Sequence, residues 1–253
     1  MFDILKAKES FMNYVRQFDL TNDKIHLKLV HTLEVVRTTE YLCLYENITG
    51  VERDLAYLIA LLHDIGRFEQ IKRFNSFDDR NIDHAKLGVQ VLFKEGMIRN
   101  FIDQYDEIIE KAIAYHSLYK IPNNLEPSLL KQVLLIRDSD KLDNFRVKNI
   151  ESIQTLFSIS DADFYSQRVS QNILKDIENH TLILKENRHN EVDMWVSYMA
   201  FVFDLNFKSS YLFIRENDYI HRNMERLHFI GDLKEDMLFV EKTCQSYVEE
   251  KCM

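Results

Sequence analysis

The chain has 253 residues, which is enough for one large domain or a domain with a substantial extension. It contains 5 Gly and 2 Pro, where average usage would give roughly 18 and roughly 13, so the composition favours long helices over strands and turns. The net charge of −9, without a basic block, argues against binding of a nucleic-acid polymer. The longest apolar run is far short of the ~20 residues that span a bilayer, and the three cysteines form no CxxC pair. These features indicate a cytoplasmic protein without disulfides and without membrane contact.

Apolar residues recur at helical spacing along most of the chain. In the first 145 residues this pattern predicts helices over 3–18, 24–46, 51–64, 84–95, 103–119 and 128–145. Residues 67–82 mix charges of both signs, and we expect them to be irregular. Residues 150–230 have a helical and strongly aromatic pattern without a motif, and 232–251 are predicted to form a last amphipathic helix.

The stretch at residues 56–67, Ala-Tyr-Leu-Ile-Ala-Leu-Leu-His-Asp-Ile-Gly-Arg, is an apolar helical run that ends in His63 and Asp64. Adjacent residues on a regular helix point about 100° apart, so both side chains can reach one metal ion only where the helix ends or opens. We expect Gly66 to supply the conformational freedom that this requires. The sequence therefore predicts the floor of a metal site here.

Six good ligands for a hard divalent metal lie near the ends or on the buried faces of five predicted helices. They are, in chain order, His31, His63, Asp64, His84, His116 and Asp140. Helical bundles can bring such side chains to one point. Histidine and carboxylate ligands without thiolate are typical of Mn, Fe, Mg, Co or Zn used for hydrolysis.

This pattern resembles the HD superfamily of metal-dependent phosphohydrolases over about residues 22–145. His31 matches the first histidine of the family motif, and His63 and Asp64, followed by Ile-Gly, match its signature pair. Asp140 matches the last aspartate of the motif. The resemblance implies an all-α fold, in which an HD-domain helical bundle is followed by an α-helical C-terminal region.

The last ligand and the domain boundaries are also predicted from the sequence. Asp138 rivals Asp140 as the last ligand, but the two lie about 200° apart around a helix, so only one should face the metal. The small residue before Asp140 favours Asp140. We expect the HD domain to cover residues 1–147, and we expect residues 148–253 to form an extension packed on it.

Two-metal members of the family add two further histidines. His84 in Asp-His-Ala-Lys-Leu-Gly and His116 in Ile-Ala-Tyr-His occur in the matching order, so we favour two divalent ions over one. The resemblance implies a first ion on His31, His63, Asp64 and Asp140, and a second on Asp64, His84 and His116. Asp64 would bridge them, and a hydroxide whose pKa the ions lower would be the nucleophile. With a single ion, His116 could instead contact phosphate or assist proton transfer.

Four cationic residues are candidates for binding substrate phosphate. Arg67 stands where His-Asp-Ile-Gly members carry a lysine, and its planar fork fits either a phosphate contact or a salt bridge. Lys72, Arg73 and Lys141 are weaker candidates of the same kind.

The leading hypothesis is a phosphohydrolase that cleaves a phosphate ester or anhydride of a nucleotide or related small molecule. Phosphodiesterase, dinucleoside polyphosphate hydrolase and nucleotidase activities all remain open. The alternative is a nucleotide-binding regulatory protein that keeps the metal pocket without turnover. The aromatic C-terminal helices could also form a homo-oligomer.

Overall fold

The chain is entirely helical in the residues that the structure describes. The structure is a computed structural model that describes residues 3–77, 79, 82–227 and 229–253, and within these ranges it contains helices and loops but no strand. This confirms the predicted all-α class. The chain divides into two compact units, residues 1–140 and 141–253. The domain boundary predicted near residue 147 stays a prediction.

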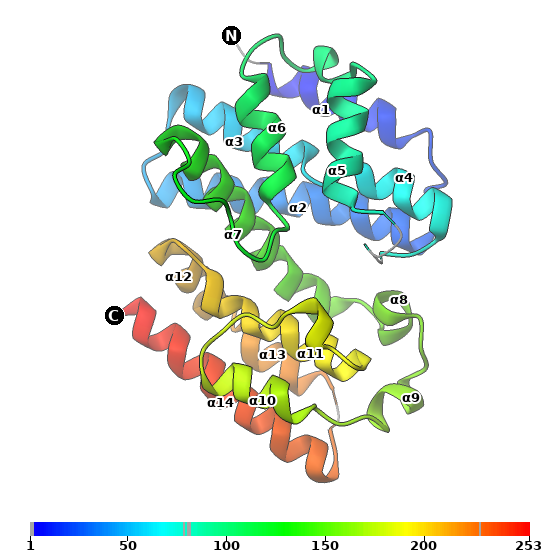
Figure 1. Ribbon diagram of the computed structural model, residues 1–253, viewed down its shortest axis with the longest axis vertical. Helices are drawn as coiled ribbons and strands as arrows, with labels where there is room; N and C mark the ends of the chain where they lie inside the picture. The colour runs from blue at the N-terminus through cyan, green and yellow to red at the C-terminus, as the bar shows by residue number, and fades with distance from the viewer. Residues whose placement is uncertain (1–2, 78, 80–81, 228) are drawn as a thin grey trace. The chain divides into compact units, whose positions relative to one another are not determined.

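The first unit carries the motif residues and is built around α3. Its elements, shown from blue to green in Figure 1, are α1 (Ile4–Val15), α2 (Asp23–Tyr45), α3 (Gly50–Leu62), α4 (Ile65–Phe74), α5 (His84–Val89), the π-helical turn η1 (Gln90–Lys94), the 3-10 turn η2 (Met97–Asn100), α6 (Asp106–Tyr115) and the start of α7 (Pro127–Ile150). Helix α3 packs against α1, α2 and α6, while α4 packs against α2 and α5.

Helix α3 is central because its sequence is apolar on every side. All eight residues from Leu55 to Leu62 are buried, and a helix that is apolar all round belongs in the interior. Burial of each large aliphatic side chain stabilises the fold by about 1.5–3 kcal/mol. The end of α3 is thereby fixed in the interior of the first unit.

Side-chain caps fix where α2 and α5 begin. Asn22 Oδ1 accepts hydrogen bonds from the backbone N–H groups of Lys24 (3.0 Å) and Ile25 (3.3 Å). The carboxylate of Asp83 accepts from the N–H groups of Ala85 and Lys86 in the same way. Each cap satisfies donors that have no partner within the helix, typically contributing about 1 kcal/mol.

The expectation of an irregular segment over residues 67–82 is wrong for its first half. Residues 67–74 belong to α4, which ends at Asn75 in the left-handed conformation (φ 46°). Ile65, Phe68 and Ile71 recur every three residues and are fully or almost fully buried, so they give this short helix a continuous apolar face. Lys72 and Arg73, two of the charges that masked this periodicity, lie on its exposed side. Residues 78, 80 and 81 fall outside the described residues.

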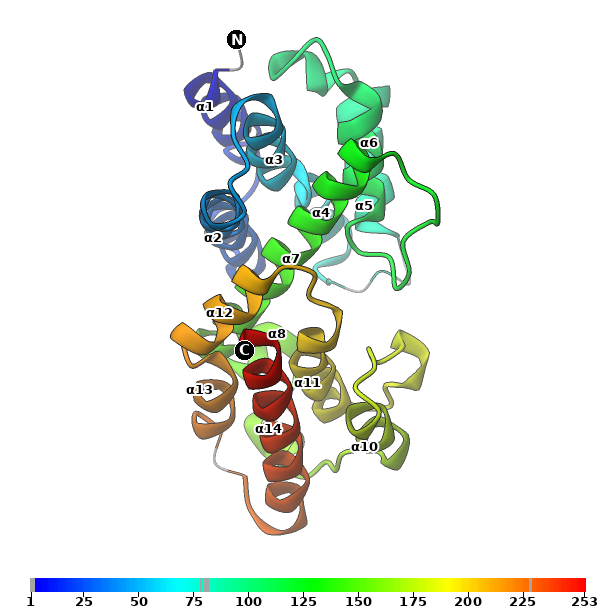
Figure 2. The same cartoon turned by 90° about the vertical axis from the view of Figure 1, so that its left-hand side faces the viewer.

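The second unit is a set of short helices around one long helix. Its elements are the end of α7, α8 (Ile153–Phe157), α9 (Asp161–Tyr165), α10 (Gln171–Glu178), η3 (Lys185–Asn187), α11 (Glu191–Met199), η4 (Ala200–Asp204), α12 (Lys208–Glu216), α13 (Tyr219–Glu225) and α14 (Gly231–Cys252). Helix α14, in red in Figure 2, packs against α10, α11, α12 and α13. Trp195 on α11 and Phe164 on α9 are fully buried.

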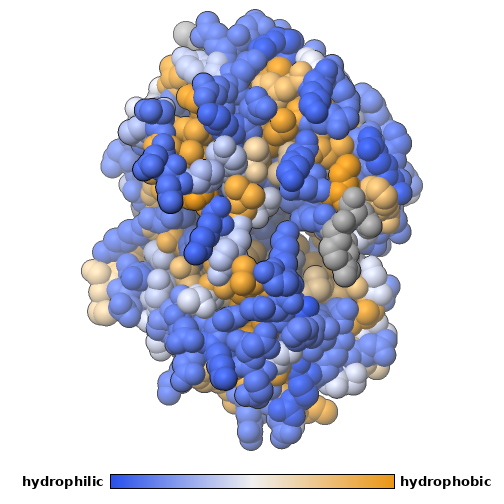
Figure 3. Space-filling view, viewed as in Figure 1, coloured by the Kyte–Doolittle hydropathy of each residue, from blue (hydrophilic) through white to orange (hydrophobic). Residues whose placement is uncertain are grey.

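The surface carries mixed polarity. In Figure 3 hydrophilic side chains cover most of the face drawn, and apolar side chains are dispersed among them. Among the described residues, no helix combines the length and the apolar character needed to cross a membrane.

Candidate metal centre

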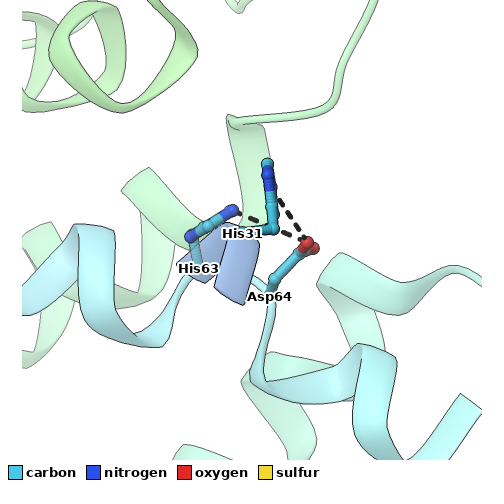
Figure 4. Close-up of side chains that lie close together, drawn as sticks. All are labelled: His31, His63 and Asp64. Carbon is cyan, nitrogen blue, oxygen red and sulfur yellow. Dashed lines mark ion pairs between the residues drawn. The ribbon is translucent and has the colours of Figure 1, made fainter. Parts of the chain in front are cut away.

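The junction between α3 and α4 presents His63 and Asp64 to one point. Helix α3 ends at Leu62, and the backbone of Asp64 leaves the helical conformation (φ −105°, ψ 15°) before α4 begins at Ile65. This break lets two adjacent side chains converge, and His63 Nε2 lies 3.6 Å from Asp64 Oδ2. Figure 4 shows His31, from α2, pointing to the same carboxylate.

Gly66 has a different role from the conformational freedom that we expected. A Cβ atom at this position would lie 2.2 Å from the carbonyl oxygen of His84 and 2.5 Å from the backbone nitrogen of Gly88. Gly66 is therefore required for the close approach of α4 to α5, backbone against backbone. This contact brings His84 to within 3.4 Å of Asp64, measured from Nε2 to Oδ1.

One oxygen of Asp64 faces the first group of candidate ligands. Asp64 Oδ2 lies 3.6 Å from His31 Nε2 and 3.6 Å from His63 Nε2. Asp140 Oδ1 completes this group, at 3.0 Å from His31 Nε2 and 3.9 Å from His63 Nε2. Asp138 is fully buried, and none of the potential metal-binding groups in the described residues includes it.

The other oxygen of Asp64 faces the second group. Asp64 Oδ1 lies 3.4 Å from His84 Nε2 and 3.9 Å from His116 Nε2. The two histidine Nε2 atoms are 3.1 Å apart. The structure thus gathers all six candidates into one buried cluster, which we call the histidine–aspartate cluster: His31, His63, Asp64, His84, His116 and Asp140.

Hydrogen bonds at the far side of three rings orient them for metal binding. The Nδ1 atoms of His63 and His116 donate to backbone carbonyls three residues earlier (2.8 and 2.7 Å), and Nδ1 of His84 lies 2.7 Å from Asp79 Oδ1. Because these oxygens only accept, the protons are assigned to Nδ1, and the lone pairs of Nε2 point into the cluster. His63 Nε2 has no hydrogen-bond partner among the described residues.

The distance between His84 and His116 shows whether a cation fits between their rings. With both protons on Nδ1, two nitrogen lone pairs face each other at 3.1 Å in a buried site, which is unfavourable without a cation between them. Two nitrogens bound to a common ion at about 2.0–2.1 Å and at a right angle would lie about 3 Å apart. The residues present therefore fit a divalent ion.

The cluster is held in the protonation state that metal binding requires. Burial, followed by the nearby Arg67 charge, lowers the pKa of His84 to about 4, and burial and His63 lower that of His116 to about 4. Burial also lowers the pKa of His63. Burial opposes ionisation of Asp64, but the positive charges of Lys28 and Arg67 favour the carboxylate and hold its pKa well below the usual range. Neutral imidazoles and an ionised carboxylate are ready to bind metal at neutral pH.

Lys28 is a residue of this site that the sequence reasoning missed. Its Nζ lies 2.6 Å from Asp64 Oδ2 and its side chain is 13 % exposed. The available signal was its position on α2, one turn before His31 and hence on the same face of the helix.

The predicted phosphate-binding residues have different surroundings. Arg67 approaches Asp64 (Nε to Oδ1, 3.7 Å) and donates through Nη1 to Asp79 (2.8 Å), so it takes part in a salt bridge. Lys72 and Arg73 are largely exposed and pair with Glu69. In the second unit, Lys141 Nζ lies 2.5 Å from Asp204 Oδ2. The proposed role of these residues in binding substrate stays a prediction.

Two buried contacts support the residues of the cluster. The guanidinium group of Arg137 donates to the backbone carbonyls of His116 and Leu118, where the end of α6 needs partners. The hydroxyl of Thr39 on α2 donates to Ser139 on α7 (2.8 Å), next to Asp140. These contacts anchor two of the ligand-bearing segments.

Comparison with known proteins agrees with this geometry. Residues 29–144 match the family described as HD domain. This part of the chain is an HD domain. The domain is that of a family of metal-dependent phosphohydrolases, and its matched region contains every residue of the histidine–aspartate cluster. No curated protein and no solved structure is similar enough to the chain to count as a match.

Proposed function

We propose that this HD-domain protein is a metal-dependent phosphohydrolase that cleaves a phosphate ester or anhydride of a nucleotide or a related small molecule. The observation that carries the proposal is the orientation of Asp64. Its Oδ2 atom faces His31 and His63, while its Oδ1 atom faces His84 and His116. A carboxylate with a separate group of ligands at each oxygen is suited to bridging two divalent ions.

The residues divide into two ligand sets. The first ion would be held by His31, His63, Asp64 and Asp140, and the second by Asp64, His84 and His116. The bound ions would supply a lowered pKa for a water molecule and positive charge that stabilises phosphoryl oxygens. The chain itself orients the rings through their Nδ1 hydrogen bonds and excludes bulk water by burial.

Access to the cluster is asymmetric. The four histidines and Asp64 are all at most 3 % exposed, whereas the side chain of Asp140 is 22 % exposed. Lys28, Arg67 and Asp79, with side chains 12–19 % exposed, also have partial access to solvent. Substrate would therefore approach the metal ligands past a mixed rim that contains two cations. This rim fits a compact phosphoryl group better than a flat apolar ligand.

The proposal is tested by product release from metal-loaded protein. Protein loaded with Mn²⁺ or Fe²⁺ is incubated with nucleotides, dinucleoside polyphosphates and cyclic nucleotides, and the products are separated by chromatography. We expect turnover of at least one class, with a loss of more than about 100-fold on Asp64→Asn because both ions depend on this residue. Asp54→Asn, on α3 and outside the cluster, should retain activity.

Two results would contradict an enzymatic role. The first is no product from any substrate class in protein shown to contain metal. The second is tight nucleotide binding without product, which would favour the alternative of a regulatory nucleotide-binding protein.

A further inference from the structure

We propose that Lys28 binds the phosphoryl group of the substrate at the histidine–aspartate cluster. The inference rests on the proposed function and deepens it, because it assigns a specific contact to the phosphate. Lys28 is the residue of α2 that precedes His31 by one turn, so its ammonium group lies at the first set of ligands. Its Nζ lies 2.6 Å from Asp64 Oδ2, the oxygen that also faces His31 and His63.

The ammonium group retains donors for a further partner. An ammonium has three N–H groups, and among the described residues the hydrogen bond to Asp64 is the one that Lys28 Nζ makes. Its side chain is only 13 % exposed, and the ring of Phe77 lies 5.7 Å from Nζ on one side. A largely buried ammonium group that still has unused N–H donors is stabilised by an anion that accepts hydrogen bonds from those donors.

The neighbouring cation is less suited to this contact. Arg67 Nη1 already donates to Gln70 (2.6 Å), to the carbonyl of Phe77 (2.9 Å) and to Asp79 (2.8 Å). Its guanidinium group is held by the loop that follows α4, and Asp79 in turn contacts His84. Arg67 therefore orients a metal ligand, whereas Lys28 remains available to substrate.

The simpler alternative is that Lys28 only balances the charge of Asp64. That role explains the geometry before metal binds, but binding of divalent ions to Asp64 neutralises the carboxylate. Lys28 would then face cations without an anionic partner, at a cost that grows as the site is desolvated. A phosphoryl oxygen between Lys28 and the first set of ligands restores the balance, so the ammonium group favours an anionic substrate at the loaded site.

The experiment separates phosphate binding from turnover. Isothermal titration calorimetry measures Mn²⁺ binding to the full chain and then inorganic phosphate binding to the Mn²⁺-loaded protein. The variants are Lys28→Met, Lys28→Arg and Lys24→Met. Lys24 lies one turn earlier on α2, carries the same charge and is not among the described contacts of Asp64, so it is the matched control.

We expect Lys28→Met to bind Mn²⁺ within about threefold of wild type and to bind phosphate about 10- to 100-fold more weakly, because a charge-assisted hydrogen bond is lost. Lys28→Arg should recover part of this affinity, and Lys24→Met should match wild type. The proposal is overturned if Lys28→Met changes phosphate affinity by less than fivefold, if it loses Mn²⁺ binding as well, or if loaded wild-type protein binds no phosphate. Failure of the proposed function would appear separately, as phosphate binding without turnover of any substrate.

Discussion

Replacement of Gly66 by alanine tests whether the site depends on the close contact between α4 and α5. The added Cβ would lie 2.2 Å from the carbonyl oxygen of His84 and 2.5 Å from the backbone nitrogen of Gly88. Both atoms belong to the backbone, so no side chain can rotate away to relieve the clash. The helices must separate by about 1 Å to restore ordinary van der Waals distances.

The magnitude follows from two opposing effects. Overpacking of a dense interior typically costs about 1–3 kcal/mol, and a clash between backbone atoms belongs at the upper end of that range. Alanine gains about 1 kcal/mol over glycine in helix propensity. The net loss of unfolding free energy should be about 2 kcal/mol, which corresponds to a fall of about 4–8 °C in Tm for a chain of this size.

The assay is thermal unfolding of metal-free protein, with Mn²⁺ titration at 25 °C as a second measurement. Separation of α4 from α5 moves His84 away from Asp64, so affinity for the second ion should fall more than about tenfold, since ligand distances tolerate only about 0.2 Å. Gly88→Ala is the matched control on the opposite helix. Its Cβ would lie 3.4 Å from Gly66 N and 3.5 Å from Ile65 Cγ2, which are ordinary contacts, so its stability should stay within about 1 kcal/mol of wild type. Equal Tm values for the Gly66→Ala variant and wild type would refute the reasoning.

Three further outcomes are expected from the described contacts. Asp79→Asn removes the charged acceptor at His84 Nδ1 and should weaken binding of the second ion by about 10- to 100-fold in calorimetry, while the first ion stays bound. Arg137→Met leaves the carbonyls of His116 and Leu118 without their buried donor and should lower the urea-unfolding free energy by about 3 kcal/mol; an unchanged midpoint would show that water replaces the guanidinium group. In EDTA, wild-type stability should fall as the pH drops from about 6.5 to about 4, because His84 and His116 have folded-state pKa values of about 4 and the unfolded chain binds their protons first. The loss should total a few kcal/mol, and a flat urea midpoint across this pH range would contradict the low pKa values.

The sequence was sufficient to predict those features of the site that depend on residues close together in the chain. The residues of the histidine–aspartate cluster were predicted from residue type, helical context and the resemblance to the HD superfamily, and the structure places all of them together. The end of α3 at Leu62 was predicted to within two residues, because the apolar run ends just before His63 and Asp64. Whether each residue holds a metal stays a prediction for binding experiments.

The contacts between helices could not be derived in this way. The position of Lys28 one turn before His31 places it on the same face of α2, but it does not show that Asp64 lies 2.6 Å away across the interface of α2 with the start of α4. The role of Gly66 was assigned to backbone freedom because its partner, 18 to 22 residues later in the chain, is not visible in local sequence. From the sequence, Arg67 could make either a phosphate contact or a salt bridge. Only the tertiary structure shows its salt bridge to Asp79.

The sequence by itself indicated an all-helical chain and the chemical identity of the candidate metal ligands, because helix periodicity and side-chain chemistry can be read from local sequence. Tertiary structure decided which oxygen of Asp64 faces which histidines. It also decided which cation reaches that carboxylate. These relations depend on the distance and rotation between packed helices, which are set by the summed contacts of the interior.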